Sequence, residues 1–116
     1  MAAHPAKLLR HLSGLAARPA AAPAPDAVLL ARFVGHRDEA AFAALVARHG
    51  PMVWRQCRRV LGEPRDAEDA FQAAFLVLAR QAGSVRRPEA LAAWLHAVAH
   101  RVALKARAAR VRRHGP

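Results

Sequence analysis

The sequence predicts an all-α protein, a small helical bundle of four to five helices that follows a disordered N-terminal tail. After residue 25, apolar residues recur at spacings of three and four, which is the period of a buried helix face. Glycine, proline or aspartate separates these stretches. The intervening loops are short, which makes neighbouring helices roughly antiparallel. No segment has the pattern of a credible β-strand.

The first 25 residues are expected to form a disordered tail rich in Ala, Pro and Arg. This stretch has no acid before Asp26 and ends in AAAPAP (20–25), which is typical of an extended linker. It lacks the continuous apolar segment of a secretory signal. Its Arg/Ala composition leaves an organellar transit peptide as a minor alternative. The folded domain is therefore predicted to span residues 26–113.

Two helices are predicted in the first part of the domain. Asp26 can accept hydrogen bonds from the free N–H groups at the start of one helix, which Gly35 ends. Asp38 caps the next helix in the same way, and Gly50 ends it. Their interior faces carry Val28, Leu29, Leu30, Phe33 and Val34 in the first helix, and Phe42, Leu45, Val46 and His49 in the second.

Three further helices complete the bundle. Pro51 suits the first turn of a helix that Gly62 ends. Asp66 is expected to cap a helix that runs to about Ala82, and Pro88 lies at the start of a long final helix. The interior residues are predicted to be Val53, Trp54, Cys57, Val60 and Leu61, then Ala67, Ala70, Phe71, Ala74, Phe75 and Leu78, and finally Leu91, Trp94, Leu95, Val98 and Val102.

The charge of the chain narrows the classes of partner. The 116 residues include 19 Lys and Arg but 8 Asp and Glu, a formal net charge of +11. Such a charge favours nucleic acid or an anionic membrane surface, without choosing between them. No apolar run approaches the ~20 residues that cross a bilayer. The one cysteine, Cys57, is predicted to be a buried thiol, and a cytoplasmic location is expected.

Half of the acids fall within seven positions of the chain, at Glu63, Asp66, Glu68 and Asp69. One interpretation is local: Asp66 caps a helix, and the next two acids each gain roughly 0.3–1 kcal/mol from the helix dipole. Capping does not explain why Gln72 lies on the same face as these acids. The other interpretation is an exposed face that binds a partner.

The C-terminal part of the chain is strongly basic. From Arg80 onward it has nine Lys or Arg residues and a single acid, Glu89. Arg86 and Arg87 lie in a predicted loop, where guanidinium groups can bind phosphates or stack on unpaired bases. Trp94 is interpreted as a core residue rather than a base-stacking platform. A solvated tail is an equal alternative for the last arginines, which are Arg110, Arg112 and Arg113.

Metal binding and catalysis find little support in the sequence. His96 and His100 have the i, i+4 spacing of paired metal ligands, but residue 97 is alanine where a metalloprotease needs glutamate, and no third ligand is evident. There is no glycine-rich phosphate loop, and no Ser or Cys has an obvious base. We expect no enzyme activity, no catalytic residues, no metal and no cofactor.

Three segments resemble region 2 of the sigma-70 family of RNA polymerase sigma factors, and most of all its extracytoplasmic-function (ECF) group. They are FAALV (42–46), DAEDAFQAAFLVL (66–78) and WLHAVAHR (94–101), and the resemblance covers about residues 28–113. It implies a bacterial promoter-specificity subunit with a sigma region 2-like fold. Such a subunit takes part in transcription initiation by binding core RNA polymerase and promoter DNA.

The family uses its DAED-type helix to dock on the clamp helices of the largest polymerase subunits. The resemblance therefore implies polymerase binding by Asp66, Glu68, Asp69 and Gln72. In the family the next loop and helix open the −10 element and hold its non-template strand. This implies DNA binding by Arg86, Arg87, His96, His100, Arg101, Lys105 and Arg107. An anti-sigma factor is a further candidate partner, and no membrane contact is implied.

The sequence departs from the family pattern at two residues and in its extent. Arg101 stands where the family often has Asn, and Lys105 where it often has an acid. Both changes add positive charge to the DNA-facing helix, so the affinity for the DNA strand should rise. Whether the helix distinguishes one base from another stays open. Region 4, the helix-turn-helix domain that reads the −35 element, is expected to be absent from these 116 residues, which leaves open a fragment, a truncated gene product or a region-2-only protein. The alternatives are a general basic nucleic-acid-binding helical module, a region-2-only regulatory protein without initiation activity, and a membrane-surface amphipathic protein.

Overall fold

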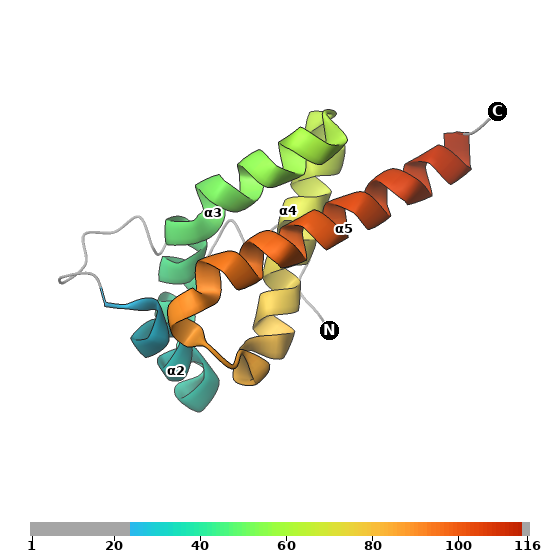
Figure 1. Cartoon of the computed structure of the whole chain (residues 1–116). Helices are drawn as coiled ribbons and strands as arrows, with labels where there is room; N and C mark the ends of the chain where they lie inside the picture. The colour runs from blue at the N-terminus through green and yellow to red at the C-terminus, as the bar shows by residue number, and fades with distance from the viewer. Residues whose placement is uncertain (1–23, 115–116) are drawn as a thin grey trace.

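The computed structural model describes residues 24–114, and these residues form an all-helical bundle (Figure 1). Its four α-helices are α2 (Asp26–His36), α3 (Glu39–Leu61), α4 (Pro64–Gln81) and α5 (Leu91–His114). Two short 3-10 turns, η1 (Ala82–Ser84) and η2 (Pro88–Ala90), connect α4 to α5. The predicted fold class is confirmed. The predicted tail lies almost entirely outside the described residues.

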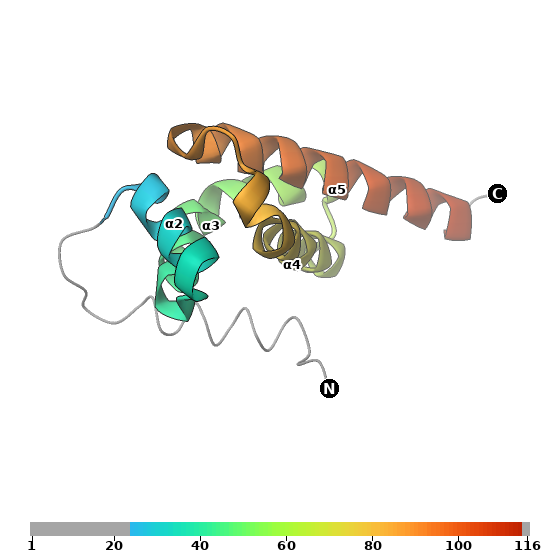
Figure 2. The same cartoon turned by 90° about the horizontal axis from the view of Figure 1, so that it is seen from below.

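Helix α3 is the centre of the bundle, because it packs against each of the other three α-helices. Its neighbours α4 and α5 also pack on each other, so the three longest helices enclose one core. Figure 2 shows α2 at one end of the bundle, while the last turns of α5 extend beyond the other helices at the opposite end. This arrangement leaves one long side of α5 open to solvent.

The core consists largely of the apolar stripes that the residue spacing predicts, but the prediction that Trp54 faces the interior is wrong, because this side chain is exposed. The largest fully buried side chains are Phe75, Leu45, Leu78, Leu91, Leu95, Val53, Val98 and Cys57. Burial raises the pKa of the Cys57 thiol to about 11, so the predicted buried thiol is confirmed. On α2 only Leu29 and Leu30 are buried, whereas Val28 and Val34 of its predicted interior face are exposed. Short α2 therefore contributes least to the core.

The helices predicted on either side of Gly50 and Pro51 are a single helix, α3, so this predicted break is wrong. Proline inside a helix loses one backbone hydrogen bond and crowds the preceding turn. Here the helix continues because both halves bury residues in the same core, Val46 before the proline and Val53 after it. Most helix stability in proteins comes from such packing rather than from local propensity.

Asp38 caps α3 as predicted, since its side chain accepts a hydrogen bond from the backbone N–H of Ala41 at 3.2 Å. The predicted cap at Asp26 is wrong: α2 follows Pro25, which makes no side-chain cap, and Asp26 is already helical. The predicted stop at Gly35 is also wrong, because α2 ends where Arg37 adopts a left-handed conformation (φ 52°).

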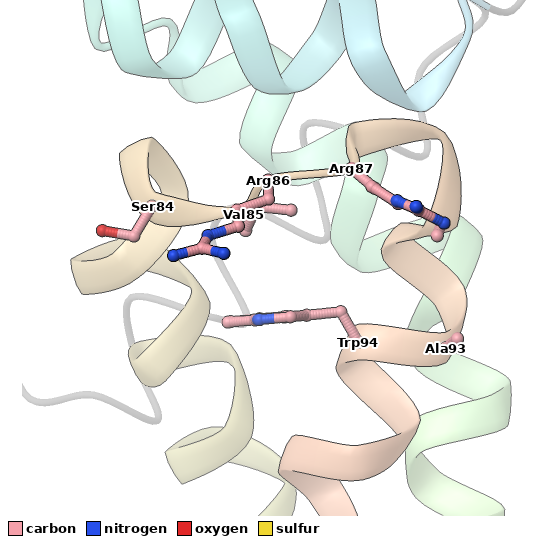
Figure 3. A pocket seen from close by; sticks show the side chains of 7 residues that line it. Ser84, Val85, Arg86, Arg87, Ala93 and Trp94 are labelled. Carbon is pink, nitrogen blue, oxygen red and sulfur yellow. The ribbon is translucent and has the colours of Figure 1, made fainter.

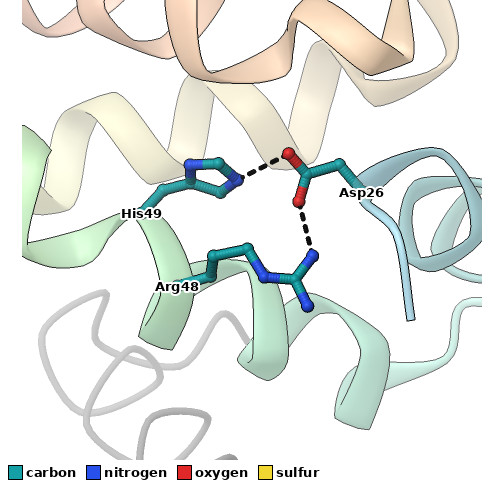
Figure 4. A network of polar contacts seen from close by, with 3 residues as sticks. All are labelled: Asp26, Arg48 and His49. Carbon is teal, nitrogen blue, oxygen red and sulfur yellow. Dashed lines mark hydrogen bonds and ion pairs between the residues drawn. The ribbon is translucent and has the colours of Figure 1, made fainter. Parts of the chain in front are cut away.

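Asp26 instead joins α2 to α3 (Figure 4). Its carboxylate accepts a hydrogen bond from Nη1 of Arg48 at 2.8 Å and lies 2.9 Å from Nε2 of His49. Burial by itself raises the pKa of this carboxyl, but the two hydrogen bonds and the charges of both partners outweigh it, so the pKa lies below its usual value. The start of α2 is thereby held against the middle of α3.

The predicted cap at Asp66 is wrong as well. Helix α4 begins two residues earlier, at Pro64, and Glu63 is its cap: the Glu63 carboxylate accepts from the backbone N–H groups of Arg65 and Asp66. Proline suits the first helical position because it has no N–H to satisfy there. Glutamate is not among the residues that usually cap helices, which is why the sequence pattern pointed to the nearby aspartate.

The connection between α4 and α5 differs slightly from the prediction. Helix α4 ends at Gln81, close to the predicted end, and η1 continues the chain for one further turn. Pro88 begins η2, and α5 itself starts at Leu91. Because η2 leads directly into α5, the segment between the two helices is held in a defined conformation at both ends.

Candidate nucleic-acid interface and acidic helix face

The predicted polymerase-binding residues of α4 lie in different environments. Glu68 and Asp69 are exposed, while Gln72 is partly buried. Asp66 is partly buried too, and its carboxylate accepts a hydrogen bond from Nη1 of Arg110 on α5 at 2.6 Å. The first helical turns thus offer two free carboxylates to a partner, and a third that is already paired within the molecule.

The exposed face of α4 has two distinct edges, because successive helical residues are about 100° apart around the axis. Asp66 and Asp69 lie at the edge near α5, where they line a shallow cavity of about 180 Å³ with Ala106, Ala109 and Arg113. Glu68 and Gln72 lie toward the other edge. Next to Glu68 on that side is Phe71, whose ring meets Trp54 of α3 edge to face, with centroids 6.1 Å apart.

An open pocket of about 540 Å³ lies at the connection between α4 and α5. Figure 3 shows the Trp94 ring reaching from α5 across this pocket, with Arg86 and Arg87 on the connecting segment beside it. The two arginine side chains point to opposite sides of the opening. The residues that line it are Ser84, Val85, Arg86, Arg87, Ala90, Ala93 and Trp94. Positive charge and an aromatic ring therefore meet at one site.

Trp94 is a site residue that the sequence interpretation missed. The prediction of a core residue is only half right, because Trp94 packs against the core but remains partly exposed in the pocket. The spacing with Leu91 and Val98 correctly placed it near the core face. The small neighbours Ala90 and Ala93 could have indicated the exposure, since short side chains leave part of a large ring uncovered.

The predicted DNA-binding residues of α5 are all exposed, but they lie on two flanks of the helix. His96, His100 and Arg107 share the first flank. Arg101 and Lys105 lie roughly 140° away around the axis, on the flank of Trp94. A ligand in the pocket is therefore continuous with the second flank only.

His100 is oriented by a buried side chain of α3. Its Nδ1 lies 2.7 Å from Nε2 of Gln56, and Gln56 is 5% exposed. A buried amide needs a hydrogen-bond partner, so this contact satisfies Gln56 and fixes the imidazole ring at the surface. Gln56 was not predicted from the sequence, because a lone glutamine within a helix carries no pattern that indicates its partner.

Within residues 24–114, no three side chains of His, Cys, Asp or Glu are grouped so as to hold a metal ion. No helix in the same range is long and apolar enough to cross a membrane.

Comparison with known proteins identifies the family. Residues 45–113 match the family model described as Sigma-70 region 2. The chain belongs to this family. The matched sigma-70 region 2 segment contains the acidic face of α4, the pocket and both flanks of α5, and leaves out α2 and the start of α3.

Individual relatives narrow the family to its ECF group. The sigma-70 region 2 chain is 41% identical over 73 residues to the ECF RNA polymerase sigma factor SigM of Mycobacterium tuberculosis strain H37Rv, and 40% identical to that of strain Erdman. These matches cover 63% of the chain and 37% of each relative. The chain thus spans little more than a third of the relatives it matches. No solved structure matches it. The predicted resemblance to ECF region 2 is confirmed.

Proposed function

We propose that this chain takes part in transcription initiation, by binding core RNA polymerase through α4 and holding the non-template strand of a −10 element at the pocket beside Trp94. The observation that carries the proposal is the pocket, where part of the Trp94 ring and two guanidinium groups are open to solvent. The relatives are sigma factors of RNA polymerase by name, which supports the same function.

The pocket suits an unpaired base better than a base pair. Unpaired bases expose faces that can stack on a ring such as that of Trp94, and Arg86 and Arg87 can neutralise neighbouring phosphates. Its volume of about 540 Å³ leaves room for one base with part of its sugar. Because a duplex hides its base faces, a site that binds only the open strand shifts the equilibrium toward melted DNA. Strand opening then requires no chemical step by the protein.

Arg101 and Lys105 extend this site along α5. They share the flank of Trp94, one following the other at the i, i+4 spacing of neighbouring surface residues. A strand whose base occupies the pocket can therefore continue past both cations. The other predicted DNA-binding residues, His96, His100 and Arg107, lie on a different flank and do not contact the same stretch of strand.

Polymerase docking is proposed for Glu68, Asp69 and Gln72. These side chains are exposed or partly so, and carboxylates on a basic protein fit a basic, hydrogen-bonding partner helix. Asp66 is the weakest member of the predicted set, because Arg110 already occupies one of its oxygens. It contributes to docking to the extent that the partner displaces Arg110.

Recovery of core polymerase by the tagged chain tests the docking face. Asp69→Arg reverses one exposed charge of the face and is expected to abolish recovery. Glu39→Arg reverses another exposed helical acid at the start of α3, distant in the chain from α4, and is expected to leave recovery unchanged. Equal recovery by all three proteins, or none by the wild type, would contradict polymerase binding and leave a general nucleic-acid-binding module.

Binding of a single-stranded −10 oligonucleotide tests the pocket. Arg86→Gln should weaken binding, and Trp94→Leu should weaken it further because leucine keeps apolar packing but offers no stacking face. Arg32→Gln removes the same charge as Arg86→Gln from an exposed position on α2, none of whose residues lines the pocket, and should have little effect. If Arg32→Gln and Arg86→Gln weaken binding equally, only the net charge matters and the pocket has no special role.

A further inference from the structure

The last turns of α3 carry three exposed arginines that neither proposed site uses. They are Arg55, Arg58 and Arg59. None of them takes part in an ion pair within residues 24–114. The Arg58 guanidinium lies 6.0 Å from the centre of the Trp54 ring, so a cation–π contact accounts for its position. Among the residues that the structure describes, Arg55 and Arg59 have no such aromatic partner, and both are exposed.

The contact between Gln56 and His100 shows that these two arginines belong to the turn of α3 that packs on α5. Arg55 precedes Gln56 directly and Arg59 follows it by three residues, so all three lie within about one helical turn. The backbones of α3 and α5 run next to each other here, as Figures 1 and 2 both show. Arg59, three residues after Gln56, shares its face of α3 and so lies beside the α5 flank of His96, His100 and Arg107, while Arg55 lies about 100° around the axis from Gln56, toward solvent on the same turn.

We call these five residues, Arg55, Arg59, His96, His100 and Arg107, the α3–α5 basic surface. Within α3 the acid is Glu39, about 24 Å from Arg55 along the helix axis, and the acid nearest in the chain is Glu63, four residues after Arg59, whose carboxylate caps α4. The surface also lacks an aromatic side chain, because Trp54, the nearest on α3, is directed toward α4 and contacts Phe71. It offers cations without a face on which a base can stack.

We propose that the α3–α5 basic surface binds the phosphate backbone of double-stranded DNA. A duplex hides its base faces, so a surface of cations without aromatic rings suits it, whereas an open strand gains from stacking. The surface lies roughly 140° around α5 from the flank of Trp94, so one strand cannot follow both. Under the proposed function, on which this inference rests, paired DNA and the open strand are then held on separate sides of α5.

Gln56 has a defined part in this surface. With Nδ1 of His100 held by the buried amide, the Nε2 edge of the imidazole is the one left free at the surface. That edge can donate a hydrogen bond to a phosphate oxygen while Arg59, and Arg55 one turn before it, supply positive charge nearby. Gln56 is a positioning residue in this arrangement and does not contact DNA itself.

The test compares binding of a blunt duplex and of a single-stranded oligonucleotide across a range of salt concentrations, by fluorescence anisotropy. The double substitution Arg55→Gln/Arg59→Gln should weaken duplex binding roughly tenfold and reduce its salt slope by about 1 for each arginine. Binding of the single strand should change less than twofold. The control Arg32→Gln/Arg65→Gln removes the same charge from α2 and α4 and should leave both probes within twofold of wild type.

Three outcomes would overturn the proposal: unchanged duplex binding, an equal loss for the control protein, or an equal loss for both probes. Unchanged duplex binding together with lost polymerase recovery would assign the arginines to a protein partner instead. The result is separable from the proposed function. The wild type could fail to recover polymerase while Arg55→Gln/Arg59→Gln still loses duplex binding selectively. That result would support duplex binding by the α3–α5 basic surface and contradict polymerase binding.

Discussion

The ion pair between Asp66 and Arg110 has opposite consequences for stability and for binding. Both side chains are partly exposed, so the pair is worth at most about 1 kcal/mol of folding free energy. It nevertheless occupies a carboxylate at the edge of the docking face. Arg110→Gln is therefore predicted to lower the free energy of unfolding by less than about 1 kcal/mol and to strengthen polymerase binding, measured by urea denaturation and by titration with core polymerase.

Arg112→Gln is the matched control for this substitution, because it removes the same charge two residues away from an exposed position that forms no ion pair within residues 24–114. It should leave both measurements unchanged. Weaker polymerase binding by Arg110→Gln would show that Arg110 itself, rather than the released Asp66, serves the partner.

Asp26 gives a second prediction at the scale of single residues. Its folded-state pKa lies below the ordinary value, so its contribution to stability is complete above an unfolded-state pKa of about 3.9 and is lost as the pH falls through the lower folded-state pKa. Asp26→Asn should thus be less stable than wild type at pH 7, and the gap should close in strong acid. Urea unfolding at pH 7 and pH 2.5 measures this, with Glu39→Gln as an unpaired control.

At the scale of whole helices, the local rule that glycine and proline end a helix failed in α3. The glycine and proline at residues 50–51 form a strong local break, yet α3 runs through them because residues on both sides are buried in one core. Long-range burial of this kind leaves no trace in a short window of sequence. The apolar stripes of α4 and α5, in contrast, were predictable because their period directly reports the face that packs.

Continuous α3 leads to a prediction for Pro51. An interior proline costs a helix about 3 kcal/mol relative to alanine, since it removes a hydrogen bond and crowds the preceding turn. Pro51 is exposed, so alanine creates no cavity. Pro51→Ala should raise the free energy of unfolding by roughly 1–3 kcal/mol, and Pro51→Gly should gain less by about 1 kcal/mol. A loss of stability with alanine would show that α3 depends on a bend at this residue.

At the scale of the whole molecule, the acidic face and the pocket are attached to one rigid helix. Asp69 lies 12 residues before the end of α4, about 18 Å along its axis, and the pocket begins just beyond that end. The motif resemblance predicted this pairing of an acidic helix with a basic loop. It could not predict that Asp66 is paired with Arg110, or that Trp94 opens onto the pocket, because both depend on which side chains happen to meet across helices.

The separation of the two sites predicts that they act independently. Substitutions this far apart, without shared partners, usually combine within about 0.5 kcal/mol of additivity. Asp69→Arg should abolish polymerase recovery and leave single-strand affinity within twofold of wild type, while Trp94→Leu should do the reverse. The double variant should show both losses and no more, by titration of each partner separately. A loss of single-strand affinity in Asp69→Arg alone would mean that α4 transmits a change to the pocket, and that the helix is not the passive link its geometry suggests.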